Sequence, residues 1–269
     1  MPQLTDPFFS EVSWGLFSIF SARDYSLGVA STDEDPVLER RAIAQMLARR
    51  VDALLITSVQ PDLDALSALE TMEIPFVSLH RRPSGGPANF AGWDDVGSGL
   101  AGATHLREIG CQRIAYIGGA NSRPAADGQA GYIQALARQG SVPPEEYIVN
   151  GDCGESSWQA FGFRAMLQLL QLSPRPDGIF CWNDPVALGA IRAIEGAELR
   201  IPEDIAVVGC GNTHSDNWSS IPPSSIDQNS PRLGASAAML ALRLVERPAM
   251  VPQSLVVQAQ LIIRASSQR

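Results

Sequence analysis

Residues 177–209 limit the possible folds of this chain more than any other stretch. A short apolar run at residues 179–182 stops at Asn183-Asp184-Pro185, and a helical pattern of apolar residues follows. A second apolar run, at residues 205–208, ends at a glycine. Continuous apolar runs joined by a helix are typical of buried parallel strands with a crossover connection. The stretch therefore predicts a strand–helix–strand unit.

The three residues between the first run and the helix predict where the helix begins. Asp184 suits the N-cap position, because its carboxylate can accept the free amide hydrogens of the first turn. Pro185 suits the first helical position, where no amide hydrogen is needed. This reading places Asn183 at the carboxyl end of a strand, where open α/β sheets bind ligands.

Strands and helices alternate along the rest of the chain in the same way. Such repeated units imply parallel, doubly wound sheets. The helical patterns number about eight, which is more than one compact open sheet needs. We therefore expect an α/β fold of two doubly wound parallel-sheet lobes with a cleft between them. The predicted strands are residues 25–30, 51–57, 74–79, 113–118 and 147–149, with an extended stretch at 255–264, and the predicted helices include residues 63–72, 97–109, 129–139, 156–172 and 231–245.

Several segments carry a resemblance to a known family. "IFCWNDPVALGAIRAI" followed by "LRIPEDIAVVG" closely resembles the effector-binding core of LacI/GalR-type transcription regulators, and "DPFF", "HLREIGCQRIAYIGG" and "LIIRASS" match other parts of that core in order. The resemblance covers nearly the whole chain and implies the fold of type I periplasmic sugar-binding proteins. It also implies the lobe boundaries: residues 1–109 with 230–252, and residues 110–229 with 253–269.

Two parts of the family's usual architecture have no match in this sequence. No helix-turn-helix precedes the core, so the resemblance implies DNA contact only through an absent N-terminal domain. The family's first strand ends at about Pro2, and its absence would leave neighbouring strands with unpaired backbone groups. We expect the sequence to be a truncated reading of a longer protein; the alternative is that another segment fills the gap.

Composition excludes several classes of protein. With 45% hydrophobic and 18% charged residues the chain reads as an ordinary globular protein, and its net charge of −9 disfavours a nucleic-acid surface. The sequence contains no apolar run of about 18 residues and no secretory signal, so we expect a cytoplasmic protein without a membrane span. The cysteines are expected to be small buried apolar side chains in a reducing compartment.

The sequence shows no constellation typical of an enzyme. It contains no phosphate loop, no nucleophile elbow and no closely spaced histidine ligands. Residues 209–211 follow a strand but lack the third glycine of a dinucleotide-binding fingerprint. Asp94 and Asp95 are adjacent carboxylates, but such neighbours more often serve separately, one of them as a helix cap. We expect no enzyme activity, no cofactor and no metal.

Residue chemistry and position nominate four binding candidates. A small-molecule site needs apolar or aromatic walls and a few polar groups that fix orientation. Asn183 offers a donor and an acceptor that suit a hydroxyl, or else forms the turn beside the helix cap. Trp182 flanks the cleft or turns into the core, and Trp158 begins a helix at the cleft rim. Arg123 reaches into the site or is a solvated loop arginine.

The resemblance implies five further candidates. Asp94 matches an acidic position that contacts effector hydroxyls, although it can also simply cap a helix. Phe8 and Phe9 match aromatics that stack on a sugar face, although both can be core residues. Asp6 stands where the family often has asparagine, and Gln228 matches a hinge position that often touches ligand or the opposite lobe.

Two positions depart from the family's sugar-binding pattern. Gly128 stands where an arginine is usual, and residues 209–211 replace the usual Gly-aromatic-Asp. We therefore expect an effector other than an ordinary hexose held by the usual residues. The predicted function is the effector-sensing and dimerisation core of a LacI-type regulator, which binds a sugar-like molecule in the cleft and forms a homodimer through the helix from Leu63 and exposed edges of the first lobe. The alternative is a solute-binding protein of a transport system.

Overall fold

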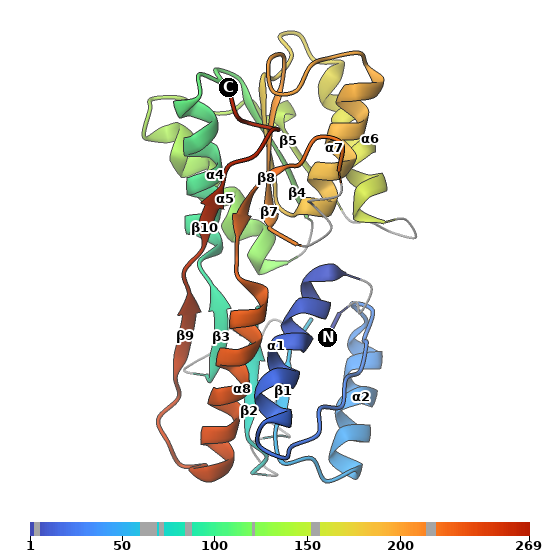
Figure 1. The fold of residues 1–269 in the computed structure, drawn as a ribbon, viewed down its shortest axis with the longest axis vertical. Helices are drawn as coiled ribbons and strands as arrows, with labels where there is room; N and C mark the ends of the chain where they lie inside the picture. The colour runs from blue at the N-terminus through green and yellow to red at the C-terminus, as the bar shows by residue number, and fades with distance from the viewer. Residues whose placement is uncertain are drawn as a thin grey trace. The chain divides into compact units, whose positions relative to one another are not determined.

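The computed structural model describes residues 1–2, 6–59, 69, 73–83, 88–119, 122–151, 157–213 and 219–269. These residues form two units, which are Met1–Trp93 with Asn229–Gln258 (unit 1) and Asp94–Gln228 with Ala259–Arg269 (unit 2). Both units are α/β structures built on parallel sheets (Figure 1). This architecture confirms the predicted fold class.

The unit boundaries differ from those that the resemblance implies. The first crossing follows Trp93 rather than residue 109, because helix α4 (Asp95–Glu108) packs along α5 (Arg123–Ala137) and so belongs to unit 2. The third crossing follows Gln258 rather than residue 252, because strand β9 (Ser254–Val257) pairs with β3 (Phe90–Trp93) of unit 1. The second crossing follows Gln228, close to the expected place.

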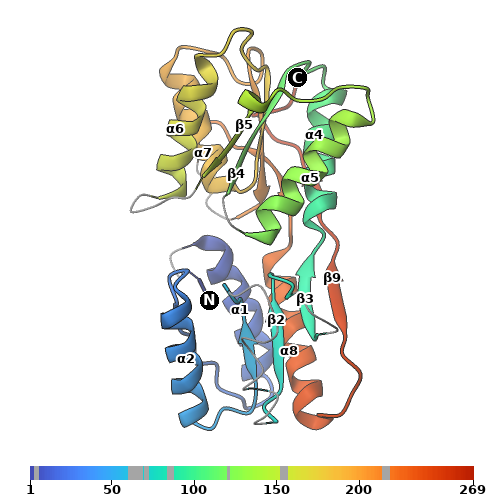
Figure 2. The same ribbon diagram turned by 180° about the vertical axis from the view of Figure 1, so that it is seen from behind.

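Unit 1 contains a parallel sheet of order β1-β2-β3-β9. Helices α1 and α8 lie side by side along this sheet, as Figures 1 and 2 both show. Apolar side chains from the two helices, among them Val12, Leu16 and Leu233, are buried against the strands. Besides β3 and β9, whose bounds are given above, the unit contains α1 (Pro7–Ser21), α2 (Pro36–Ala48), β1 (Leu54–Ile56), β2 (Phe76–Leu79) and α8 (Ser230–Glu246).

Residues 25–30 are not a strand, and the prediction of one there was wrong. A strand needs a hydrogen-bonded neighbour, and within the described residues β1 is the end of the sheet and has no partner on its outer side. Val29 is consequently 40% exposed despite its apolar side chain. The helix predicted at residues 63–72 lies outside the described residues except for Leu69, which is helical and buried.

Unit 2 contains a six-stranded sheet of order β10-β8-β7-β6-β4-β5, parallel except for β10. Helices α4 and α5 cover one face and α6 and α7 the other (Figures 1 and 2). The predicted strand–helix–strand block is confirmed as β6, α7 and β7. The bounds are β4 (Ile114–Gly119), β5 (Ile148–Gly151) after a short 3-10 turn (Glu145–Tyr147), α6 (Trp158–Leu170), β6 (Gly178–Cys181), α7 (Asp184–Gly196), β7 (Ala206–Gly211), β8 (Ser224–Asp227) and β10 (Gln260–Ile262).

The sequence patterns missed the first turns of one helix and two whole strands. Helix α5 begins at Arg123 rather than residue 129, because the Ser122 hydroxyl accepts the Ala125 N–H at 3.3 Å and caps an earlier first turn. Strands β3 and β8 were not predicted, since the sequences FAGW and SSID contain too few apolar residues for a strand signal.

The cysteines that the structure describes are buried and form no disulfide. Cys111, Cys181 and Cys210 are all free, as expected of small apolar side chains, while Cys153 lies outside the described residues. Burial raises the pKa of the Cys111 thiol to about 11, so that thiol stays protonated. Over the described part of the chain, none of the helices combines the length and the apolar character that membrane crossing requires.

Candidate functional site

The start of α1 and the ends of β2 and β3 bring four aromatic side chains together in unit 1. The Phe8 ring centroid lies 4.6 Å from that of Phe9, 5.3 Å from that of His80 and 5.0 Å from that of Trp93. Phe9 and Trp93 are buried, whereas Phe8 and His80 are partly exposed. Phe9 is thus a core residue, and Phe8 presents the accessible aromatic surface of this cluster.

His80 is a functional candidate that the sequence reasoning missed. It directly follows β2, and its backbone φ is +63°. Its Nδ1 atom is shielded from water and has no hydrogen-bond partner among the described residues. Burial, with a smaller effect of the Arg81 charge, lowers the pKa of the imidazole to about 3, so the ring is neutral near pH 7. Its position after a predicted strand was the signal that could have identified it.

The low pKa of His80 predicts a stability change with pH. Because the folded-state pKa of about 3 lies below the ordinary value of 6.5, only the unfolded chain binds this proton between those values. His80 therefore lowers the free energy of unfolding as pH falls from 6.5 towards 3, by at most about 1.4 kcal/mol per pH unit. Urea unfolding at pH 7 and pH 5 measures the effect, and His80→Asn, which tolerates positive φ, should reduce the difference. Equal differences in both proteins would contradict the assignment.

Asp6 and Asp94 both cap helices. Asp6 Oδ1 accepts the Phe8 N–H at 3.0 Å at the start of α1, and Asp94 Oδ1 accepts the Gly97 N–H at 2.8 Å at the start of α4. Asp94 is exposed, and its Oδ2 has no hydrogen-bond partner in the described part of the chain. Because a carboxylate offers about four acceptor positions, the cap leaves Asp94 able to accept from a ligand hydroxyl.

Asn183, rather than Asp184, caps helix α7. Its Oδ1 accepts the Val186 N–H at 2.9 Å, and the prediction that Asp184 is the cap was wrong. Asp184 is fully buried, and its carboxylate accepts the Ser225 hydroxyl at 2.7 Å and the Thr213 N–H at 3.4 Å. Because the cap occupies Oδ1, the side-chain NH₂ group of Asn183 is left as its available hydrogen-bond donor.

Trp182 and Trp158 pack edge to face beside Asn183. Their ring centroids lie 5.0 Å apart with an interplanar angle of 69°. A Cβ on Gly119 would lie 2.8 Å from the Trp182 ring, so this glycine lets the indole lie over the end of β4. The Trp182 Nε1 atom is buried and has no partner among the described residues. Trp182 therefore joins the core with its ring while keeping an unused donor.

The last two candidates, Gln228 and Arg123, have different environments. Gln228 directly follows β8 and is only 8% exposed, and none of the described residues hydrogen-bonds to its side-chain amide. Arg123 is the first residue of α5, not a loop residue, and its side chain is exposed. Its guanidinium lies 3.4 Å from the Asp127 carboxylate, which leaves no observation that places it in a ligand site.

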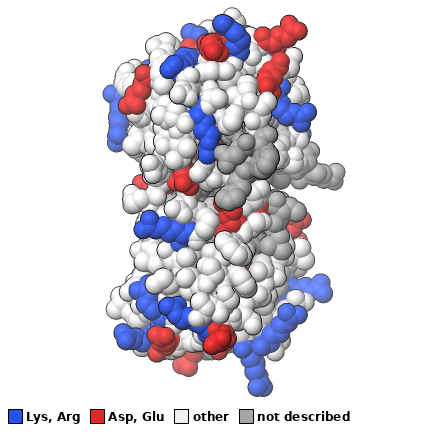
Figure 3. Space-filling view, in the orientation of Figure 1, with Lys and Arg blue, Asp and Glu red and all other residues white. Residues whose placement is uncertain are grey.

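Charge and metal-ligand chemistry add no further site in the described residues. On the face drawn in Figure 3, basic and acidic side chains are interspersed over a largely uncharged surface without a continuous basic patch. The described residues also contain no group of histidine, cysteine and acidic side chains that could hold a metal ion. The candidate ligand-binding groups are therefore the aromatic rings and hydrogen-bonding side chains described above.

Comparison with known proteins establishes the family. Residues 103–267 match the model of the periplasmic binding protein-like domain. The ribose operon repressor of Escherichia coli K12 is 30% identical over 267 residues, covering 98% of this chain and 79% of that protein. The HTH-type transcriptional repressor PurR of Erwinia tasmaniensis is 32% identical over 265 residues, covering 97% of this chain and 76% of that protein. The chain belongs to the LacI family of transcription regulators.

Solved structures agree with this membership. A complex of the transcriptional regulator CelR with cellobiose is 26% identical, has a TM-score of 0.86 and covers 97% of this chain and 79% of that one. A LacI family regulator from Enterococcus faecalis V583 with bound ribose is 25% identical, also has a TM-score of 0.86 and covers 99% and 96%. Because the curated relatives are transcriptional repressors, the LacI-type core is a regulator and not an enzyme.

Of the two departures from the LacI-type pattern, only the one at Gly211 has a structural reason. A Cβ on Gly128 would lie 3.4 Å from the Tyr116 hydroxyl oxygen, which is an ordinary van der Waals contact. Gly211 has a φ of +127°, a region that favours glycine, and a Cβ there would lie 3.1 Å from the Asp184 carboxylate. An aspartate at Gly211 would combine backbone strain with repulsion between like charges.

Proposed function

We propose that this chain is the effector-sensing and dimerisation core of a LacI-type regulator whose effector is a small, uncharged, hydroxyl-bearing molecule. The aromatic cluster around Phe8, with the unpartnered Nδ1 atom of His80, is the observation that carries the proposal. An aromatic surface suits the apolar face of a sugar ring, and a shielded polar atom suits a single hydroxyl group.

The polar candidates support an uncharged effector. Asn183 offers an NH₂ donor and Asp94 an acceptor, which together match hydroxyl groups. Gly128 provides no cation at the family's usual arginine position, and Asp94 would repel an anion. Two related regulators were solved with cellobiose and with ribose, which supports a sugar-like ligand class here.

The proposed mechanism is a shift between conformations. An effector shifts such an equilibrium only by its differential affinity for the two states. In the proposal, this shift controls operator binding by a homodimer through DNA-binding domains. The transport alternative shares the fold, but the curated relatives are repressors, so no observation favours it.

A thermal-shift screen with sugars, polyols and nucleosides, including ribose and cellobiose, tests this function. A ligand that binds only the folded state raises the melting temperature. Asn183→Asp should keep the helix cap but remove the NH₂ donor, so we expect near-normal stability without ligand and an affinity at least about tenfold lower. The matched control is Asp35→Asn, which makes the reverse exchange at the cap of α2 and should leave ligand affinity unchanged.

Phe8→Ala provides an independent arm of the same screen. It removes the accessible aromatic ring of the Phe8 cluster and should lower affinity for the same ligand. Unchanged affinity in both Asn183→Asp and Phe8→Ala would contradict the proposed residues. A folded protein that responds to no compound in the panel would contradict the proposed effector class.

A further inference from the structure

Unit 2 carries a row of aromatic rings at the carboxyl ends of the neighbouring strands β5, β4 and β6. Trp158 and Phe161 lie in the first turn of α6, and Trp182 directly follows β6. The Trp158 ring centroid lies 5.9 Å from that of Phe161 and 5.0 Å from that of Trp182, and both contacts are edge to face. In open α/β sheets, ligands bind at this end of the strands.

Two glycines at the strand ends make room for these rings. A Cβ on Gly119, the last residue of β4, would lie 2.8 Å from the Trp182 Cζ2 atom and 2.9 Å from its Cε2 atom. A Cβ on Gly151, the last residue of β5, would lie 2.4 Å from the Phe161 ring. The two neighbouring strands therefore end in residues that let aromatic rings lie directly over them.

The indole N–H of Trp182 is a buried donor without an acceptor. Its Nε1 atom is shielded from water, and none of the described residues accepts a hydrogen bond from it. Cε2 is bonded to Nε1, so the N–H edge of the ring lies beside Gly119 at the end of β4. A buried tryptophan N–H usually finds a partner, because an unpaired one loses its bond to water without replacement.

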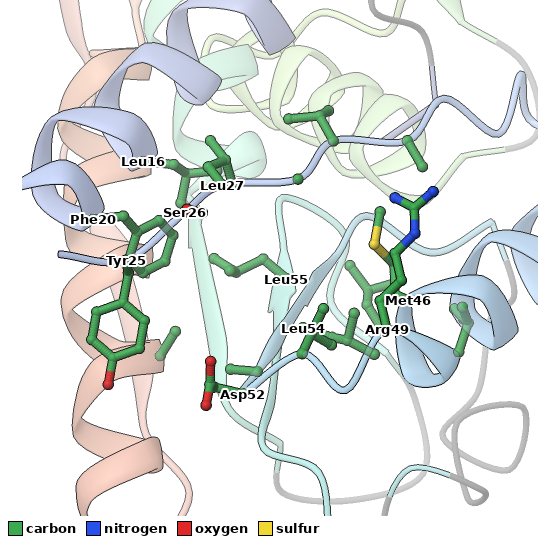
Figure 4. Close-up of a pocket in the computed structure, with 18 of the residues that line it drawn as sticks. Leu16, Phe20, Tyr25, Ser26, Leu27, Met46, Arg49, Asp52, Leu54 and Leu55 are labelled. Atoms are coloured by element: carbon green, nitrogen blue, oxygen red, sulfur yellow. The ribbon is translucent and has the colours of Figure 1, made fainter.

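The Thr57 hydroxyl of unit 1 is also buried without a partner in the described residues, but its surroundings differ. It lines an apolar cavity of about 520 Å³, whose walls include Leu54 and Leu55 of β1 and Met46 of α2 (Figure 4). A cavity of this size has room for water, and a hydroxyl can rotate towards it. The N–H of Trp182 points along a fixed ring that is packed on both Trp158 and the end of β4, so it cannot turn to another acceptor.

We propose that Trp182 determines effector specificity by donating its indole N–H to an acceptor atom of the effector. This inference rests on the proposed function and adds one requirement to it. Besides its hydroxyl groups, the effector carries a planar group with a carbonyl oxygen or a ring nitrogen, and this group lies against the aromatic row. An indole N–H donates and cannot accept, so a ligand group that only donates is rejected here.

The surroundings of this N–H favour a carbonyl oxygen or ring nitrogen over a hydroxyl group. Either atom accepts a hydrogen bond and brings no proton that needs an acceptor of its own. A hydroxyl that accepted from Trp182 would place its own proton among the rings of Trp158 and Phe161, which offer no oxygen. A planar group also suits the partly exposed ring of Trp158, because flat aromatic surfaces stack.

Trp182→Phe tests the donor, because phenylalanine keeps an aromatic ring and loses the N–H. The probes are ribose and uridine, which is a ribose that bears a planar carbonyl-containing ring. By calorimetric titration we expect uridine to bind at least about tenfold more tightly than ribose, and Trp182→Phe to lower the uridine affinity at least about tenfold. The ribose affinity should change less than about twofold. The matched control is Trp14→Phe on α1, where the ring is exposed, and it should change neither affinity.

The ligand-free variant provides a second arm of the test. Removing an unpaired buried donor offsets the packing that the smaller ring loses. We therefore expect the melting temperature of Trp182→Phe to lie within about 2 °C of that of the unchanged protein. A larger fall would show that the N–H is already satisfied in the free protein, and would overturn the proposal.

Nuclear magnetic resonance of isotope-labelled tryptophan separates a hydrogen bond from a packing effect. The Trp182 indole signal is the one that disappears in Trp182→Phe, and uridine should move it downfield as a hydrogen bond forms. If uridine or ribose binds but neither this signal nor the affinity of Trp182→Phe changes, the role of Trp182 is wrong and the proposed function stands. A folded protein that binds neither these probes nor any other compound of the thermal-shift panel would contradict the proposed function, and the role of Trp182 with it.

Discussion

Gly131→Ala is expected to lower the free energy of unfolding by about 3 kcal/mol. A Cβ at this position would lie 2.0 Å from Val96 O and 2.7 Å from Leu100 N. Both are backbone atoms of α4, so no flexible side chain can move aside, and helices α4 and α5 would have to separate. Urea or guanidinium unfolding measures the change.

Gly128→Ala is the matched control, because it lies in the same helix one turn away. The nearest atom to a Cβ there is the Tyr116 hydroxyl oxygen at 3.4 Å. This is an ordinary van der Waals contact, and alanine has the better helix propensity, so we expect a change within about 1 kcal/mol. Equal losses in the two variants would show that helix packing at Gly131 is not the cause.

Asp184→Ala is expected to lower the free energy of unfolding by a similar amount, about 3 kcal/mol. The carboxylate is fully buried and accepts hydrogen bonds from the Ser225 hydroxyl and the Thr213 backbone. Alanine leaves these buried donors without their acceptor and opens a small void beside Gly209, where a Cβ would lie 2.2 Å from the Asp184 carboxylate. The loss should appear in equilibrium unfolding of unit 2.

Asp127→Ala is the control for removing an aspartate from the same unit. Asp127 is partly exposed, and its ion pair within the described residues is with the exposed side chain of Arg123, so we expect a change within about 0.5 kcal/mol. A loss at Asp184 no larger than that at Asp127 would mean that the buried hydrogen bonds contribute little. Asp184→Asn, which keeps the shape, should fall between the wild type and Asp184→Ala.

Helix caps show how far local sequence reasoning reached. The helix after the β6 strand was predicted from its apolar periodicity, but the choice between Asn183 and Asp184 as cap was wrong. Both residues suit the position by propensity. The choice depends on two buried donors from distant parts of the chain, the Ser225 hydroxyl and the Thr213 N–H. Both donate to the Asp184 carboxylate, which therefore does not cap the helix.

Residues 25–30 show a different limit. Their apolar pattern indicates a strand, but a strand exists only when a neighbour pairs with it. The described structure supplies no such neighbour. The pattern therefore indicates a strand propensity, but no strand among the described residues pairs with this segment.

Periodicity and order along the chain were enough to establish the α/β class, the two-unit organisation and the LacI-type resemblance, because buried parallel strands and amphipathic helices leave local signatures. Packing over long sequence distances alone established which side chains meet. Phe8, His80 and Trp93 come from three separate elements, and their rings approach within 5.3 Å only because β2 and β3 are adjacent strands that end beside the start of α1. A local pattern carries no information about such a meeting, so the contacts of His80 with Phe8 and Trp93 became visible only in three dimensions.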